Sequence, residues 1–517
     1  MHSRRQFLSR AGGAGAVVLL APQAALGQSA KSRALLRGGR FSQGVLSGDP
    51  TPHGITLATI VDDVEGSGGV RLEVARDSGF HRVVASKVFS TDAARNHSVK
   101  ARVSGLRSGE RYFYRFETRN RQSLVGRFKT ALPADSREPV RFVFYSCADY
   151  THGFYNAYEA MAREDDIDFV LCLGDYIYAD VQHTRAGGTA VRDDKRGEAK
   201  TLADYRAKYA LYRSDASLRK MHARFPLVAL WDDHEVLNDY AGSLPDGGLP
   251  PAAGYTVARR NAAYRAFFEA MPFVPSGRSR IYRALRFGRH AELILLDERQ
   301  YRGDQPCGDT VGPDCPERQV PRPFLGAKQL AFAKARLSAS KASWKLIGNP
   351  TLMMPTKAGP TVYAPMDSWM GYTQEREDLI AHIAKVSDVA FLTGDFHTFL
   401  AGDVRPGESA DKAAAVAPEF QSGSITSQTL GEGQGGVIPG ANDANPNTNP
   451  AIIAALRQFN PWILEADLDH HGYGVAEVSA NELEVSFRRV RTIKQRSRDR
   501  LPDMRWTVAK GQRSLFP

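Results

Sequence analysis

Short apolar runs alternate with Gly, Pro, Asp and Ser over residues 41–131. Within these runs, for example residues 54–61 and 97–103, apolar and polar positions follow a period of two. This period is typical of strands with one buried face, and regularly spaced turn residues are typical of two packed sheets. The pattern therefore predicts an N-terminal β-sandwich domain over residues 41–131.

A segment rich in breakers, residues 132–139, precedes a chain with a different pattern. From Val140 onward, continuous apolar runs alternate with helical stretches, the first of them at about residues 154–164. Strand, helix and strand in this order predict βαβ units and a parallel sheet. We therefore expect an α/β domain over residues 140–500, followed by a C-terminal tail over residues 501–517.

Several of these apolar runs end in side chains that can bind metal ions or transfer protons. Because the carboxyl ends of strands in an open α/β sheet lie at one edge, we expect these side chains to converge. Each alone has a structural explanation, such as a helix cap, a turn or a buried inert thiol. In chain order they are Cys147, Asp175, Tyr178, Asp233, His234, Asn349, Asp395 and His397.

The densest cluster is the run Trp231-Asp-Asp-His-Glu235, which directly follows an apolar stretch. Buried carboxylates require positive partners, and we expect metal ions rather than Lys or Arg to supply them. His234 would orient a ligand or act as a general acid. Cys147 could instead be a nucleophile paired with a distant His, but the neighbouring carboxylates favour thiolate ligation to a metal.

The N-terminus indicates export. Arg4 and Arg5 precede a weakly apolar stretch that reaches small residues at Ala25 and Gly27, which predicts a twin-arginine signal peptide over residues 1–27. A disordered tail with two arginines is the alternative. Beyond the signal, no apolar run is long enough for a membrane-spanning helix. We expect a secreted or periplasmic protein that is not transmembrane.

Composition adds little to the choice of partner. At 517 residues, with 42% hydrophobic and 24% charged residues, the chain is ordinary and long enough for two domains. Removing the signal takes away three arginines, so the net charge falls from +11 to 11 − 3 = +8. The 57 acidic residues are interspersed, so we expect no nucleic-acid partner.

Cys307 and Cys315 could form a local disulfide after export. The loop over residues 431–450 is either filler or a mobile cover.

In order along the chain, a set of motifs resembles the alkaline phosphatase D family of twin-arginine-exported, calcineurin-like metallophosphoesterases. The resemblance covers nearly the whole chain. It implies a four-layer α/β/β/α metallophosphoesterase sandwich with an N-terminal fibronectin III-like domain. The motifs are Ser146-Cys147, Gly174-Asp-Tyr-Ile-Tyr178, Trp231-Asp-Asp-His-Glu235, Gly348-Asn-Pro350, Gly394-Asp-Phe-His397 and His471-Gly-Tyr473.

The resemblance also implies hydrolysis of phosphate monoesters, and of diesters, by a metal-activated water or bridging oxide. A ferric ion, Fe3+, would be bound by Cys147, Asp175, Tyr178 and His397, with Asp175 bridging. One or two Ca2+ ions would be bound by Asp233, Asn349 and Asp395, because a site with oxygen ligands alone favours Ca2+ over Zn2+. Asp175, Asp233 and His234 would be catalytic.

His152, Arg206 and Arg213 are candidates for binding the substrate phosphate, although solvation of a helix surface explains the two arginines equally well. The expected partners are phosphate esters, including phospholipids or phosphodiester polymers, and the twin-arginine export machinery. Two alternatives remain open. One is a phospholipase D-like phosphodiesterase that acts on lipid head groups, and the other is a cell-surface binding protein without activity.

Overall fold

The structure is a computed structural model that describes residues 18–20, 34–180, 190–242, 254–277, 279–308, 312–363, 365–407, 415–433 and 450–516. Of the predicted signal peptide it describes only strand β1 (Val18–Leu20), which pairs with β6 (Ser98–Ser104). The rest of the signal lies outside the described residues, as does most of the loop predicted over residues 431–450. No described helix combines the length and the apolar character needed to span a membrane.

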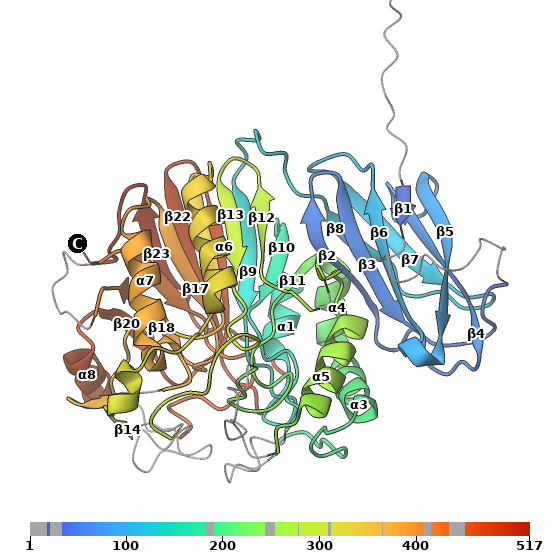
Figure 1. Ribbon diagram of the computed structural model, residues 1–517. Helices are drawn as coiled ribbons and strands as arrows, with labels where there is room; N and C mark the ends of the chain where they lie inside the picture. Colours follow the sequence, from blue (N-terminus) through green and yellow to red (C-terminus); the bar gives the residue numbers. More distant parts are fainter. Residues whose placement is uncertain are drawn as a thin grey trace, which may run out of the picture.

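The N-terminal region is a β-sandwich, at the right of Figure 1. In β4 (Ser67–Ala75), the side chains of Val70, Leu72 and Val74 are fully buried between the two sheets, as the period of two predicts. One sheet contains β6, β3 (Gly54–Ile60) and β2 (Val45–Thr51), and the other has the order β5 (Val83–Asp92), β4 (Ser67–Ala75), β7 (Arg111–Glu117) and β8 (Gly126–Lys129).

Strand β2 also joins the sandwich to the α/β region. Gly48 pairs in parallel register with Leu227 of β11 (Leu227–Ala229), so the two regions share one ten-stranded sheet. A Cβ atom at Gly48 would lie 2.5 Å from the carbonyl oxygens of Leu227 and Pro272, so only glycine permits this approach. The sequence pattern did not predict this continuity.

The α/β region contains two facing sheets. In the first, β9 (Val140–Tyr145), β10 (Phe169–Cys172) and β11 are parallel, and β21 (His471–Val478), β22 (Glu482–Val490) and β23 (Met504–Ala509) continue it antiparallel. The second has the order β12 (Arg283–Phe287), β13 (Ala291–Leu295), β15 (Trp344–Asn349), β17 (Val389–Thr393), β19 (Ala417–Gln421), β18 (Phe399–Val404) and β20 (Ile463–Asp467).

Helices form the two outer layers, which confirms the predicted four-layer sandwich (Figure 1). Successive side chains near β13 belong to different cores: Leu293 and Leu295 pack between the sheets, whereas Ile294 and Leu296 pack with two helices of an outer layer. The helices are α1 (Asn156–Met161), α3 (Leu202–Arg213), α4 (Ala216–Arg224) and α5 (Val257–Ala270) on the first sheet, and α6 (Gly326–Ala339), α7 (Thr373–Ile383) and α8 (Pro450–Phe459) on the second.

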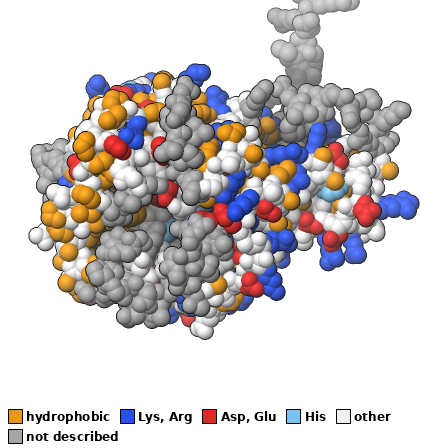
Figure 2. All heavy atoms as spheres, turned by 60° about the horizontal axis from the view of Figure 1, so that its bottom comes forward, with side chains coloured by type: hydrophobic (Ala, Val, Ile, Leu, Met, Phe, Trp, Pro, Cys, Tyr) orange, Lys and Arg blue, Asp and Glu red, His pale blue; other side chains and the backbone are white. Residues whose placement is uncertain are grey.

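The short elements are the 3-10 helices η2 (Ala93–Arg95), η3 (Pro316–Gln319) and η4 (Trp369–Gly371), and the strand pair β14 (Gly312–Pro313) and β16 (Val362–Tyr363). Near β14, Cys307 and Cys315 form a disulfide with 5.9 Å between their Cα atoms. Seen from the lower edge, hydrophobic side chains gather over the α/β region, and both charge signs are interspersed toward the sandwich (Figure 2). The described basic side chains of this face are therefore mixed with acidic ones.

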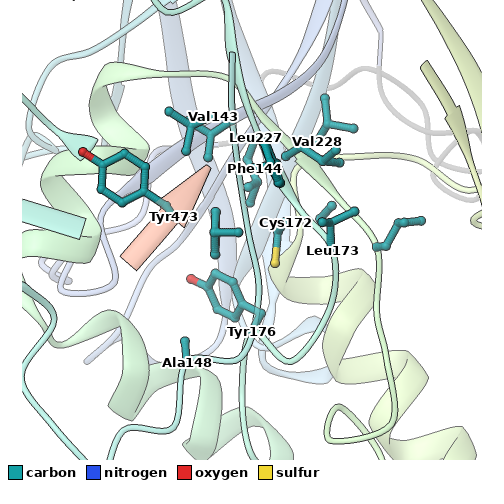
Figure 3. Packing of buried hydrophobic residues seen from close by; sticks show 14 of the residues in the cluster. Val143, Phe144, Ala148, Cys172, Leu173, Tyr176, Leu227, Val228 and Tyr473 are labelled. Atoms are coloured by element: carbon teal, nitrogen blue, oxygen red, sulfur yellow. The ribbon is translucent and has the colours of Figure 1, made fainter. Parts of the chain in front are cut away.

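The C-terminal segment corrects one prediction. Residues 504–509, expected in a tail, form β23, whose partner is β22. Trp506 contacts Phe487 edge-on with 4.8 Å between ring centroids. This aromatic contact stabilises the pairing of β23 with β22 at the edge of the sheet. In the same layer Cys172 lies in the core beside Leu173, Tyr176 and Val228 (Figure 3), as expected for an inert buried thiol.

Candidate metal centre

The centre lies where the carboxyl ends of β9, β10 and β11 meet those of β15 and β17, at the lower edge of Figure 1. The turns that follow these strands place four predicted ligands in left-handed backbone. The φ angles are 61° for Cys147, 54° for Asp175, 69° for Asp395 and 54° for His397. This conformation is uncommon for residues with a side chain and concentrates at functional sites.

Three different donor types surround the Asp175 carboxylate. Its Oδ2 lies 3.4 Å from Cys147 Sγ and 3.3 Å from the Tyr178 hydroxyl, and that hydroxyl lies 3.0 Å from His397 Nε2. All four side chains are buried. We call Cys147, Tyr178 and His397 the mixed-donor side of the centre. The structure brings these residues together, as the strand-end pattern predicts.

The ionisable groups of the mixed-donor side have shifted pKa values that favour binding of a cation. Burial, together with the Asp175 charge, raises the pKa of Cys147 and of Tyr178 well above their usual values. Burial lowers the pKa of His397 to about 3. His397 Nδ1 lies 2.9 Å from the Gln428 carbonyl oxygen, so Nδ1 carries the hydrogen and Nε2 keeps its lone pair. A cation would therefore compensate a thiolate and a phenolate that burial otherwise disfavours.

Four carboxylates form the second half of the centre. Asp175, Asp232, Asp233 and Asp395 each place one oxygen within 4.8 Å of the others. We call Asp232, Asp233 and Asp395 the acid side, with Asp175 shared between both sides. Asp233 Oδ1 is buried and accepts no hydrogen bond among the described residues. An oxygen of this kind is available to a cation.

Arg299 corrects the expectation that only metal ions balance these acids. Its fully buried guanidinium is hydrogen-bonded to both oxygens of Asp232, and lies 3.0 Å from Asp367 Oδ2. It also lies 3.6 Å from Asp233 Oδ1 and 3.9 Å from Asp395 Oδ1. Burial opposes ionisation of Asp233, but the Arg299 charge lowers the pKa of Asp233 below its usual value. One cation is therefore already part of the acid side.

Both polar atoms of the Asn349 side chain have hydrogen-bond partners. Its Nδ2 donates to the Thr351 carbonyl, and its Oδ1 accepts a hydrogen bond of 3.0 Å from the Trp369 indole. The assignment of Asn349 as a Ca2+ ligand stays a prediction. Asp239 and Asp367, which the strand-end pattern does not predict, form a cluster with Asp233.

His234 lies between the two halves and packs on Tyr178, with 3.9 Å between the ring centroids. Its Nδ1 is 3.0 Å from Asp180 Oδ1. Although burial alone lowers it, the pKa of His234 is raised well above its usual value by the charges of Asp233, Asp180 and Asp175. The imidazole is therefore kept protonated, with Asp180 fixing the ring.

Glu235, the last residue of the acidic run, has a structural role. Its carboxylate accepts hydrogen bonds from the backbone N–H groups of Asp175, Tyr176 and Asp232, at 3.1, 2.6 and 2.8 Å. These bonds tie the turn after β10 to the turn after β11. Glu235 therefore fixes the spacing between Asp175 and the acid side.

The predicted phosphate-binding residues have other partners. Arg206 forms a bidentate pair with Glu269 at 2.7 Å. Arg213 is fully buried, with Nε 3.0 Å from the Tyr176 hydroxyl, so helix-surface solvation does not explain it either. His152 Nε2 lies 2.9 Å from Glu432. These contacts fix local structure and do not support a phosphate-binding role.

Two family models match this chain. The model described as PhoD-like phosphatase matches residues 142–487, and the model described as PhoD-like phosphatase, N-terminal domain, matches residues 27–132. Alkaline phosphatase D of Bacillus subtilis (strain 168) is 35% identical over 470 residues, which cover 87% of this chain and 77% of that protein.

Solved structures give a consistent result. The structure of PhoD superposes with a TM-score of 0.82 at 31% identity, and the match covers 94% of this chain and 92% of that one. The purple acid phosphatase PPD1 from yellow lupin seeds superposes with a TM-score of 0.53 at 13% identity, over 86% of this chain and 71% of that one. The second likeness shows that the fold is shared.

Proposed function

Because the chain belongs to the PhoD-like phosphatase family and is thus a phosphoric ester hydrolase, we propose that it hydrolyses phosphate monoesters, and also diesters, at two unlike metal ions. The observation that carries the proposal is the position of Asp175. Its carboxylate contacts the thiol and phenol of the mixed-donor side and also belongs to the carboxylate cluster of the acid side. A bridging carboxylate of this kind holds two cations close together.

The donor chemistry supports a different metal for each side. Cys147, Tyr178, His397 and Asp175 would hold Fe3+, because thiolate, phenolate and imidazole together suit iron better than Ca2+. Asp233 and Asp395, with Asp175 shared, would hold Ca2+ through oxygen atoms alone. When bound, such ions polarise the phosphoryl group and lower the pKa of a coordinated water molecule.

The side chains of the centre complete the proposed reaction. His234, kept protonated by the surrounding acids, would donate its proton to the departing alkoxide oxygen. Asp180 would hold the ring through Nδ1, which leaves Nε2 as the donating nitrogen. Arg299 would hold Asp232, and the acid side as a whole, in place while the charge on the substrate changes.

We also propose export through the twin-arginine pathway to the periplasm or the medium. Arg4 and Arg5 ahead of the apolar stretch support the signal. The disulfide between Cys307 and Cys315 supports an oxidising destination. Expression of the full chain with Arg4 and Arg5 both changed to Lys should leave the protein in the cytoplasm; continued export would contradict the assignment.

Metal analysis and visible absorption of natively exported protein test the metal assignment. We expect one iron, one or two calcium ions, and a tyrosinate-to-iron absorption band. The Tyr178→Phe variant should lose the band. Tyr176→Phe is the matched control, because its hydroxyl contacts Arg213 instead, and it should keep the band. Protein that contains only zinc would overturn the assignment.

Substrate preference is tested with one preparation of the enzyme. Hydrolysis of an aryl phosphomonoester, an aryl phosphodiester and phosphatidylcholine should be compared by kcat/KM under identical conditions. We expect the monoester to be the best substrate. A strong preference for phosphatidylcholine would support a phospholipase D-like enzyme, and the absence of any hydrolysis by the metal-loaded protein would support a binding protein.

A further inference from the structure

A second buried cluster of ionisable side chains lies beside the metal centre. Nε2 of His152 and Nε2 of His471 lie 2.9 and 3.2 Å from Glu432 Oε2. Lys494 Nζ lies 3.4 Å from Glu432 Oε1 and 3.1 Å from His152 Nε2. The two rings and the carboxylate are buried, and they come from three distant parts of the chain. We call these four residues the Glu432 cluster.

The charges of the Glu432 cluster are balanced within it. Two imidazoles and a carboxylate are common zinc ligands, but here an ammonium group already contacts both the carboxylate and one ring. Although burial opposes ionisation, the neighbouring His471 and His152 lower the pKa of Glu432 below its usual value. The carboxylate is therefore ionised and paired with Lys494, whose ammonium group lies against Glu432 Oε1 and His152 Nε2.

The segment of residues 424–433 connects this cluster to the mixed-donor side. Its backbone N–H groups at Ile425, Thr426 and Ser427 all approach the Cys147 carbonyl oxygen, at 3.1 to 3.3 Å. The Ser427 hydroxyl donates to the Tyr178 oxygen at 2.6 Å.

The same segment supplies the Gln428 carbonyl that accepts from His397 Nδ1. One short segment thus contacts three of the four proposed iron ligands.

Both ends of the segment are held by the Glu432 cluster. At the start, the Ser424 hydroxyl donates to the Ser427 carbonyl at 2.6 Å, so it accepts the hydrogen of His471 Nδ1, 2.9 Å away. At the end, the Thr429 N–H donates to Glu432 Oε2 at 3.1 Å, and Gln428 Nε2 donates to the Glu432 carbonyl at 3.0 Å. The segment is therefore fixed by polar contacts on both sides of Ser427 and Gln428.

We propose that the Glu432 cluster positions residues 424–433 so that Ser427 and Gln428 set the donor strength of Tyr178 and the orientation of His397. This inference rests on the proposed function, since it assumes that these two residues bind iron. A hydrogen bond to a phenolate oxygen withdraws electron density from it. Outer partners of this kind orient metal ligands and change metal affinity about 10- to 100-fold.

The first test uses the visible spectrum and iron content of the full-length enzyme. Ser427→Ala should move the tyrosinate-to-iron band to longer wavelength, because the phenolate becomes a stronger donor. Ser422→Ala is the matched control: this buried serine hydroxyl contacts the Thr393 carbonyl and no proposed ligand. Equal bands in wild type, Ser427→Ala and Ser422→Ala would overturn the proposal for Ser427.

The second test separates the cluster from the metal proposal. Glu432→Gln should speed amide hydrogen exchange in peptides that cover residues 424–433 and weaken iron retention about 10-fold. Lys494→Met, at a partly exposed position, gives the same readout if Glu432→Gln does not fold. Glu477→Gln, an exposed position on β21, should change neither quantity.

The outcomes distinguish the two proposals. If wild type has no iron band, the metal assignment fails, whereas the exchange rates still decide whether the cluster positions the segment. Unchanged exchange in Glu432→Gln and Lys494→Met would overturn the positioning role. A further transition-metal equivalent that is lost in Glu432→Gln but retained in Asp175→Asn would also overturn it, because the cluster would then be a metal site.

Discussion

The two sides of the metal centre differ in the source of their positive charge. On the acid side, Arg299 contacts Asp232 directly and lies within 4 Å of Asp233 and Asp395. On the mixed-donor side, the polar contacts of the Cys147 and Tyr178 side chains are with serine hydroxyls, a carboxylate and the His397 imidazole, and the protonated His234 ring stacks on Tyr178. An arginine therefore compensates the acid side directly, whereas the mixed-donor side has a stacked imidazolium and, in our proposal, needs a bound cation to form its thiolate and phenolate.

This difference teaches that the two sides respond differently when a charge is removed. The acid side is prepared for an ion by an arginine that remains in place. The mixed-donor side holds neutral thiol and phenol groups, because burial raises the pKa of both. Binding of a metal ion to this side therefore requires that the thiol and the phenol lose their protons.

The largest effect should come from the residue that the two sides share. Asp175→Asn keeps the shape but removes the bridging charge, so we expect kcat/KM to fall on the order of a thousandfold. Steady-state hydrolysis and circular dichroism check this result. Asp388→Asn is a matched control, because Asp388 is also buried with φ near 57° but lies away from the centre. A folded Asp175→Asn variant with full activity would refute the two-metal proposal.

The second largest effect should come from removing the Arg299 guanidinium, which compensates the carboxylates of the acid side. Arg299→Met leaves several buried carboxylates without their partner, and we expect a loss of about 3 kcal/mol in the free energy of unfolding of the metal-free protein. Added Ca2+ should reduce this loss. Urea unfolding with a chelator and with Ca2+ measures both.

Arg505→Met is the control for Arg299→Met, because its ion pair with Glu484 is exposed, and it should cost less than about 1 kcal/mol. A loss at Arg299 that Ca2+ does not change would show that the arginine and the ion do not share the same acids.

The pH dependence of iron binding should sharpen the comparison further. Because the pKa of Cys147 and of Tyr178 is raised, both protons are still bound at neutral pH and must leave when the ligands form. Apparent iron affinity should thus rise with pH, about tenfold per unit for each proton released. Asp233, whose pKa is lowered, is already ionised and contributes no such slope.

Competition with a chelator between pH 6 and 8 measures this slope. Tyr178→Phe should lower it by one proton. An identical slope in wild type and Tyr178→Phe would contradict the assignment of Tyr178 as a phenolate ligand.

The smallest effect should come from the other free cysteine. Cys172 lies in the apolar core (Figure 3), one strand from Cys147, and its thiol contacts the Gly174 carbonyl oxygen rather than a proposed ligand. Cys172→Ala should cost about 1 kcal/mol in unfolding free energy through lost packing. It should leave the visible band unchanged, whereas Cys147→Ala should change the band; thermal melting and absorption spectra compare the two variants.

Most residues of this centre can be predicted from the sequence, because the ends of the strands can be recognised in it. Continuous apolar runs locate the strands, and the polar residue that follows each run locates an edge of the sheet. Cys147, Asp175, Asp233, Asp395 and His397 were all selected in this way, and the structure brings them together. The same reasoning selects Asn349, whose Oδ1 accepts a hydrogen bond from Trp369.

Residues outside that pattern could not be selected. Arg299 follows the apolar run of β13 in the sequence Asp297-Glu-Arg299, but the strand-end pattern points to side chains that bind metal ions or transfer protons, and an arginine does neither. Asp367 and Ser427 lie in irregular segments far along the chain. Their approach to the centre depends on tertiary packing, which local periodicity does not encode.

The single backbone pairing between Gly48 and Leu227 has a consequence for dissecting this protein. Strand β11 is three residues long, and its outer edge is covered by β2 of the sandwich. A fragment that begins at β9 would present β11 as an open edge, available for pairing with another chain. The sandwich thus protects the edge of β11 from pairing with another chain. We expect a fragment without the sandwich to be less soluble, so its loss of activity would not show that the sandwich recognises the substrate.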